Sequence, residues 1–175
     1  MQEYSFSHRF ERRVHTIKGA KFTLESATLG KSKHKQAAAF CYKKKNGKQY
    51  ILMVTSRGSK QWILPKGWIE DDLTEKELAA LEAEEEAGVV TKPEKIKKIG
   101  LYRYTKQVSR TRSVPVDVNV YSMPIRRLKK KFKERHQRKR KWVTIKEAIK
   151  LVSDKDLEAF LKKLHDNQFS NGSCS

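Results

Sequence analysis

The sequence has little cysteine: Cys41 and Cys174 are its two thiols in 175 residues. They do not have the spacing of metal ligands and do not suggest a disulfide framework, which fits a reducing compartment, so we expect a cytoplasmic protein. No apolar run approaches the roughly 20 residues that a membrane-spanning helix needs. Glu3 and Glu11 interrupt the basic N-terminal stretch, and no apolar core follows, so we expect neither a signal peptide nor membrane contact.

Several catalytic motifs are also missing. There is no Gly-x-Ser-x-Gly sequence and no glycine-rich nucleotide-binding loop. The histidines are scattered in polar, basic surroundings without the spacing of metal ligands. They are His8, His15, His34, His136 and His165. These absences argue against nucleophilic serine catalysis and against a histidine-bound metal.

Acidic residues are few relative to basic ones, with 20 Asp and Glu against 40 Lys and Arg and a net charge of +20. A field of this size attracts polyanions, either nucleic acid or multiply phosphorylated small molecules. Much of the excess lies in residues 126–141, which we call the basic segment and which contains one acid, Glu134. Two interpretations stay open for it, phosphate binding and a solvated connector. Phe132 is its one aromatic residue, which weakens a nucleic-acid interpretation.

The acidic residues that are present gather in one place. Glu82, Glu85 and Glu86 lie at positions i, i+3 and i+4 of a predicted helix, so their carboxylates share one face. Like charges repel at this distance unless a cation lies between them, and carboxylate oxygens are the ligands that Mg²⁺ prefers. The spacing predicts a metal site, and the alternative is an acidic, solvated helix face.

The first half of the chain predicts a hairpin followed by a capped helix. Apolar runs at 37–42 and 49–55 flank Asn46-Gly47, a typical hairpin turn. A short strand at 62–64 precedes the loop at 65–67. Thr74 and Glu77 form a capping box at the start of the acidic helix, and Gly88 ends it. A further short strand is predicted at 21–24.

The second half predicts strands at 98–107, 115–123 and 142–145 and helices at 146–152 and 154–164. Val116, Val118 and Val120 alternate with polar residues, which indicates a strand with one apolar face. The segment 167–175 is polar and is expected to be a flexible tail. The chain length suits one domain.

A family resemblance rests on the region around the acidic helix. Gly67, five residues, position 73, seven residues, position 81 and then Glu82-Ala-Glu-Glu85-Glu86-Ala-Gly88-Val89 resemble the Nudix box. The lead-in Trp62-Ile-Leu-Pro-Lys66 is similar to the diadenosine and diphosphoinositol polyphosphate hydrolase branch. Two positions depart, since Leu73 stands where the family has Glu and Leu81 where it has Arg. Because both charges are lost together, neither remains unpaired, and we interpret the two leucines as an apolar brace.

The resemblance implies an α/β fold, a Nudix-like α/β/α sandwich with a mixed β-sheet. It implies an N-terminal extension at 1–35, a Nudix hydrolase domain at 36–166 and a tail at 167–175. The implied activity is a metal-dependent pyrophosphohydrolase that cleaves a phosphoanhydride in a nucleoside-diphosphate-linked compound, in particular a dinucleoside or other polyphosphate.

The resemblance also assigns roles to residues. Glu82, Glu85 and Glu86 would ligate Mg²⁺ or Mn²⁺. Arg57, Lys66 and Gly67 are candidates for binding substrate phosphate oxygens. The general base would be one of the three metal-binding glutamates, or Glu70 or Glu134.

Two alternatives remain open from the sequence. One is a catalytically impaired Nudix domain that binds RNA or a phosphorylated ligand, which Leu73 and Leu81 favour. The other is an RNA 5′-pyrophosphohydrolase, which the positive field would serve. The expected partner is a small polyphosphate or nucleotide, with RNA as the alternative, and the sequence leaves the oligomeric state open.

Overall fold

The computed structural model describes residues 34–69 and 72–170, with side chains as far as residue 167. The described residues belong to one compact unit, Lys31–Ser175. The predicted strand at 21–24 and the candidate base Glu70 lie outside the described residues.

The predicted hairpin is confirmed. Strands β1 (His34–Lys45) and β2 (Lys48–Thr55) pair antiparallel, and Lys45 lies opposite Lys48 at the turn. Asn46 and Gly47 have φ angles of 51° and 70°. Both angles are positive, as a tight two-residue hairpin turn requires, and asparagine and glycine adopt them at low cost.

Within the described residues, the hairpin forms the centre of a seven-stranded sheet. The added strands are β3 (Trp62–Ile63), β4 (Lys66–Trp68), β6 (Lys97–Gln107), β7 (Ser113–Pro124) and β9 (Arg140–Val143). The main path runs β3-β2-β1-β7-β6, with β4 paired to β1 and β9 paired to β2. The β1–β7 pair is parallel and the others are antiparallel, so the sheet is mixed, as expected.

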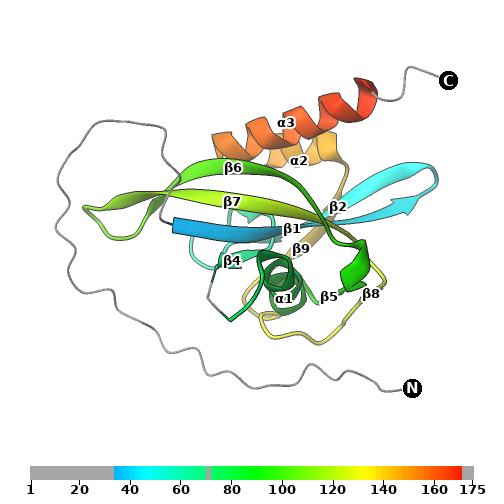
Figure 1. Cartoon of the computed structure of the whole chain (residues 1–175), viewed down its shortest axis with the longest axis horizontal. Coiled ribbons are helices and arrows are strands. Elements are labelled where there is room, and N and C mark those ends of the chain that lie inside the picture. Colours follow the sequence, from blue (N-terminus) through cyan, green and yellow to red (C-terminus); the bar gives the residue numbers. More distant parts are fainter. Residues whose placement is uncertain (1–33, 70–71, 171–175) are drawn as a thin grey trace. The chain divides into compact units, whose positions relative to one another are not determined.

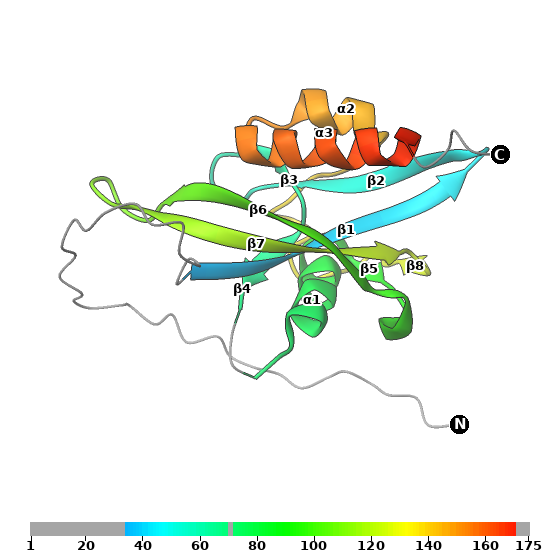
Figure 2. The ribbon, with the colours of Figure 1, turned by 45° about the horizontal axis from the view of Figure 1, so that its top comes forward.

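Helices cover both faces of this sheet. Helix α1 (Glu75–Ala87) lies on one face, and α2 (Ile145–Leu151) and α3 (Lys155–Ser170) lie on the other, as Figures 1 and 2 show. Val116, Val118 and Val120 point into the cluster shared with α2 and α3, which confirms the alternation in β7. The arrangement is the predicted α/β/α sandwich. None of the helices in the described ranges combines the length and apolar content that crossing a bilayer requires.

Several element boundaries differ from the predictions: β1 and β7 are longer at both ends, and β4 begins inside the loop expected at 65–67. The strand expected at 142–145 is β9, which ends at Val143 because Thr144 and Glu147 form a second capping box that starts α2 at Ile145. The helix expected at 154–164 is α3, which continues to Ser170 and therefore includes the first residues of the expected tail.

The basic segment also contains regular structure that the sequence did not suggest. Its strand β8 (Arg127–Leu128) pairs with β5 (Val89–Val90), which follows α1 directly. A 3₁₀ turn (Pro93–Lys95) then leads into β6. This small sheet ties the start of the basic segment to the C-terminal end of α1.

Candidate functional site

Helix α1 lies close to the central strands because its inner face is made of small residues. Ala79, Ala83 and Ala87 recur at four-residue spacing and are completely buried, in a cluster that also contains Ala37 and Ala39 of β1. Alanine on both sides lets the helix backbone approach the sheet closely. The residues that precede Ala83 and Ala87 are Glu82 and Glu86, so the same packing buries their carboxylates at the edge of the helix–sheet interface.

The start and end of this helix are determined locally, as predicted. The Thr74 side chain accepts a hydrogen bond from the Glu77 backbone N–H, and the Glu77 carboxylate accepts one from the Thr74 N–H, which completes the capping box. Gly88 has a φ of 67° and ends the helix in the left-handed conformation. Both ends are therefore where the sequence places them.

Glu82 is 4% exposed and packs against the backbone of Gly67 in β4. A Cβ atom on residue 67 would lie 2.1 Å from Oε1 of Glu82 and 2.4 Å from its Cδ. No side chain larger than hydrogen fits there unless Glu82 moves. The missing side chain at Gly67 therefore lets the Glu82 carboxylate approach the backbone of β4 closely.

Glu86 is also 4% exposed and has two identified partners. Its Oε2 accepts a hydrogen bond from the Lys66 backbone N–H at 3.2 Å, and its Oε1 accepts one from Nη2 of Arg138. Burial raises the pKa of Glu86 to about 7, and the neighbouring charges of Glu82 and Glu134 add to this rise while Arg138 opposes it. Three carboxylates are thus near enough to interact electrostatically.

Arg138 holds two of these acids together. Its Nε donates to Glu134, four residues earlier, while Nη2 donates to Glu86. Its Nη1 donates to the carbonyl oxygen of Thr55 at 2.9 Å. The side chains of Arg138 and Glu86 are each 5% exposed, and that of Glu134 is 12% exposed. The more exposed Arg57 lies 3.6 Å from the other oxygen of Glu134.

The rest of the basic segment docks on the acidic helix. Lys129 forms an ion pair with Glu84, and Lys133 forms one with Glu85 at 2.9 Å. The Glu134 backbone N–H donates to the Glu85 carbonyl at 3.0 Å. Part of the positive charge therefore neutralises α1, a structural role that neither of our two interpretations of this segment had included.

Arg140 adds contacts that involve no carboxylate. Its Nη1 donates to the carbonyl oxygens of Ala87 at 2.7 Å and Lys129 at 3.2 Å, and its guanidinium lies 4.4 Å from the centre of the Phe132 ring. These contacts attach the basic segment to the C-terminal end of α1 without touching the acidic cluster.

The Lys66 ammonium does not simply point to solvent. It is half-buried and lies 5.3 Å from the centre of the Tyr104 ring. Burial lowers the pKa of Lys66 to about 8, and the positive charge of Lys106 adds to the effect. Burial likewise lowers the pKa of Lys106, with a further contribution from Arg57. Lys106 thus repels both Lys66 and Arg57 electrostatically, and the three cations form a positive group near Tyr104.

Comparison with known proteins decides the family. A sequence model of the NUDIX domain matches residues 33–167. The chain belongs to the Nudix family. The resemblance inferred from residues 67–89 is confirmed.

Individual Nudix proteins are similar to the chain at a moderate level. It is 30% identical over 130 residues to Nudix hydrolase 12, mitochondrial, of Arabidopsis thaliana, and 28% identical over 120 residues to diphosphoinositol polyphosphate phosphohydrolase 2 of Rattus norvegicus. Each match covers 67% of this chain, and they cover 61% and 62% of the relatives, so the chain spans about three fifths of their length. The crystal structure of a C. elegans Ap4A hydrolase aligns with a TM-score of 0.57 and 21% identity over 77% of this chain and 98% of that one, which supports the fold.

The Nudix box residues are a suitable donor set for a hard divalent cation. Mg²⁺ is commonly held by one or two carboxylates, with waters and substrate phosphates as the other ligands. Glu82 and Glu86 supply two buried carboxylates one helical turn apart. Over 34–69 and 72–170, no group of three or more His, Cys, Asp and Glu side chains is arranged to hold a metal ion. The two buried carboxylates therefore fit a metal ion whose other ligands are substrate phosphate oxygens and water. One oxygen of the Glu86 carboxylate already accepts a hydrogen bond from Arg138.

The two departures from the Nudix box have different surroundings. Leu73 packs against the apolar cluster under α1. Leu81 is half-buried on α1 and belongs to neither apolar cluster of the described residues. The brace of Leu73 against Leu81 stays a hypothesis.

Sequence reasoning missed the part that Arg138, Lys133 and Lys106 play around this Nudix site. Arg138 follows Glu134 by four residues, the spacing of a helical ion pair, and this was the one local sign of it. Lys133 and Lys106 gave no sign, because their neighbours come from distant segments.

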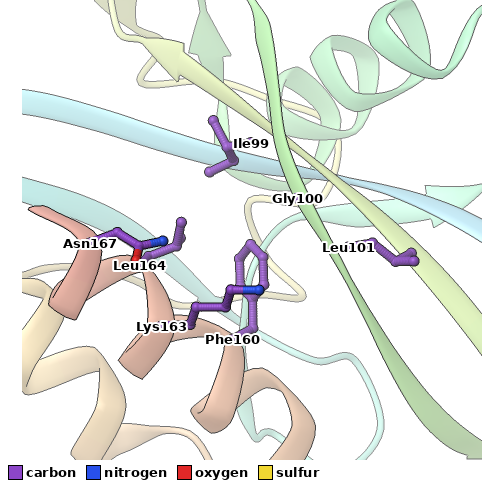
Figure 3. A pocket seen from close by; sticks show the side chains of 7 residues that line it. All are labelled: Ile99, Gly100, Leu101, Phe160, Lys163, Leu164 and Asn167. Atoms are coloured by element: carbon purple, nitrogen blue, oxygen red, sulfur yellow. The ribbon is translucent and has the colours of Figure 1, made fainter.

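A separate pocket of about 80 Å³ lies between β6 and α3, where the labelled side chains of Figure 3 surround it. Its lining includes Ile99, Phe160 and Leu164. Small-molecule sites usually have about 300 Å³ or more. Because it is small and lies on the sheet face opposite α1, we do not assign it to the substrate.

Proposed function

We propose that this Nudix chain is a metal-dependent pyrophosphohydrolase that cleaves a phosphoanhydride bond in a nucleoside-diphosphate-linked compound, in particular a dinucleoside or other polyphosphate. One observation carries the proposal: the buried carboxylates of Glu82 and Glu86 lie against the backbone of Gly67 and Lys66. This arrangement combines metal donors with a cationic, glycine-containing strand. The names of the relatives, a diphosphoinositol polyphosphate phosphohydrolase and an Ap4A hydrolase, support a polyphosphate substrate.

The proposed roles follow from charge. Glu82, Glu85 and Glu86 are the metal-binding set, with Glu82 and Glu86 as the buried donors. A bound Mg²⁺ or Mn²⁺ ion would neutralise phosphate charge and lower the pKa of a bound water. Lys66 and Arg57 bind the non-bridging phosphate oxygens, and Lys106 extends this set because its charge acts on Lys66.

The base that accepts the water's proton is a carboxylate near these donors. Among the described residues Glu134 is the candidate, because its charge acts on Glu86 and two arginines hold it in place. Glu70, which lies outside the described residues, remains the second candidate. Gly67 of β4 remains a candidate for binding substrate phosphate oxygens.

A second candidate function is a Nudix domain that binds RNA or a phosphorylated ligand without turning it over. The contact between Arg138 and Glu86 favours it, because a guanidinium already neutralises one of the proposed metal donors. Leu73 and Leu81 favour it as well. Removal of pyrophosphate from an RNA 5′ end is a third activity that the same site and field would serve.

A substrate screen separates these functions. Purified protein with Mg²⁺ or Mn²⁺ is tested against diadenosine polyphosphates, diphosphoinositol polyphosphates, nucleotide sugars, nucleoside triphosphates and 5′-triphosphate RNA, with EDTA and Glu86→Gln as controls. We expect metal-dependent release of phosphate or nucleotide from a polyphosphate. Binding of a compound without turnover would support the second candidate. We propose a cytoplasmic location. Because one relative is named as mitochondrial, a fluorescent fusion should be used to test the proposed location.

A further inference from the structure

We propose that the Arg138 guanidinium is an internal cation that competes with a divalent metal ion for the Glu86 carboxylate. Metal binding would then require the contact between Arg138 and Glu86 to break. The inference rests on the proposed function only in taking Glu86 as a metal donor. It gives the site a built-in control over metal occupancy.

The pair of Arg138 and Glu86 is buried. The side chains of both residues are 5% exposed, so water screens their interaction little and each neutralises the other strongly. A cation that binds Glu86 must overcome this interaction or displace it. Lys133, which pairs with Glu85, has a side chain that is 53% exposed. Such an exposed cation competes far less with a metal ion for its carboxylate.

Cations of the protein already balance most of the charge of the acidic cluster. Glu85 and Glu86 each have a basic partner, Lys133 and Arg138, and Glu134 has Arg138 and Arg57. A divalent ion therefore gains the full attraction of the carboxylates only when one of these ion pairs separates.

The other contacts of Arg138 allow its contact with Glu86 to break. The guanidinium is a rigid plane whose Nε stays bonded to Glu134 and whose Nη1 stays bonded to the Thr55 carbonyl, so the Glu86 carboxylate is the group that turns away. One hydrogen bond breaks and two remain, so the guanidinium does not become an isolated buried charge. The exchange therefore needs a shift of the Glu86 side chain.

A purely structural brace would behave differently. If Arg138 only held Glu86 in the correct place for metal, its removal would weaken metal binding. If Arg138 competes, its removal strengthens metal binding. The direction of the change in affinity therefore distinguishes the two roles.

The test measures Mn²⁺ binding by isothermal titration calorimetry, without substrate, for wild type and Arg138→Gln. We expect Mn²⁺ to bind Arg138→Gln about tenfold more tightly or better, the size of a typical coupling between two ligands. Arg140→Gln is the matched control, because it removes an arginine of the same segment that contacts no carboxylate in the site. We expect its Mn²⁺ affinity to stay near that of wild type.

A double variant keeps the test possible if Arg138→Gln alone does not fold. Arg138→Gln with Glu134→Gln removes one positive and one negative charge together and still releases Glu86. At a fixed Mn²⁺ concentration, we expect the metal to raise the melting temperature of this variant more than that of wild type.

Equal or weaker Mn²⁺ binding in both Arg138 variants overturns the competition, and so does an equal gain in Arg140→Gln. Binding that survives Glu86→Gln in the double-variant background also overturns it. Loss of the proposed function has a different signature. If no substrate is hydrolysed while the Arg138 variants bind Mn²⁺ more tightly, the hydrolase proposal falls and the competition stands.

Discussion

Gly67 leaves the space that the Glu82 carboxylate occupies: a Cβ atom on residue 67 would lie 2.1 Å from Oε1 of Glu82. The glycine of the Nudix box therefore makes room for Glu82 across the interface of β4 and α1. Any larger residue at 67 displaces the carboxylate that we propose as a metal donor.

Gly67→Ala is predicted to lower the free energy of unfolding by about 1–3 kcal/mol, the usual cost of overpacking, and to lower turnover because Glu82 moves. In a Glu82→Ala background the same change should cost much less, because the clashing atoms are gone. Urea unfolding of wild type, the two single variants and the double variant measures this. Gly58→Ala is the control, since a Cβ there meets open space. An equal cost of Gly67→Ala in both backgrounds would show that another neighbour is responsible.

Glu85→Gln and Glu86→Gln are each predicted to lower turnover by about 10²-fold or more, as loss of a catalytic electrostatic group does. The domain should remain folded, which circular dichroism checks. Glu84→Gln is the control on the same helix, because Glu84 is 43% exposed and pairs with Lys129. If the variants at 85 and 86 keep wild-type rates on the best substrate, the metal assignment is wrong.

The two leucines of the box give a prediction about stability. Leu73→Glu should lower the melting temperature more than Leu81→Arg, because Leu73 packs against the apolar cluster under α1 and Leu81 does not belong to it. If the two side chains brace each other, the double variant should recover much of the loss through a new ion pair. Additive losses in the three melting curves would remove the brace hypothesis.

The basic segment gives a prediction about ionic strength. Replacing Lys129, Lys130 and Lys131 by alanine should raise the Michaelis constant for a polyphosphate at low salt and flatten its salt dependence, because fewer counterions are released on binding. Lys129 lies close to the site, because it pairs with Glu84 on the helix that carries Glu82. Replacing Lys44, Lys45 and Lys48 at the turn of the β1–β2 hairpin removes the same charge elsewhere and serves as the control (Figure 1). Identical kinetics of both triple variants at two ionic strengths would leave the segment without a role in guiding substrate.

The amino-acid sequence by itself determined the features that depend on neighbouring residues. The Asn46-Gly47 turn, the capping box at Thr74 and the end of α1 at Gly88 each rest on the conformational preferences of a few adjacent positions. The i, i+3, i+4 spacing of Glu82, Glu85 and Glu86 is likewise a local feature, and all three lie in α1. These local relationships were sufficient to recognise the family.

The tertiary structure alone decided which distant groups meet these glutamates. Arg138 reaches Glu86 across 52 residues, and Lys133 reaches Glu85 across 48, because the pairing of β9 with β2 and of β8 with β5 folds the basic segment over α1. No local propensity encodes such a contact. It depends on where the backbone places two segments, and a buried ion pair forms only when that placement removes both charges from water together.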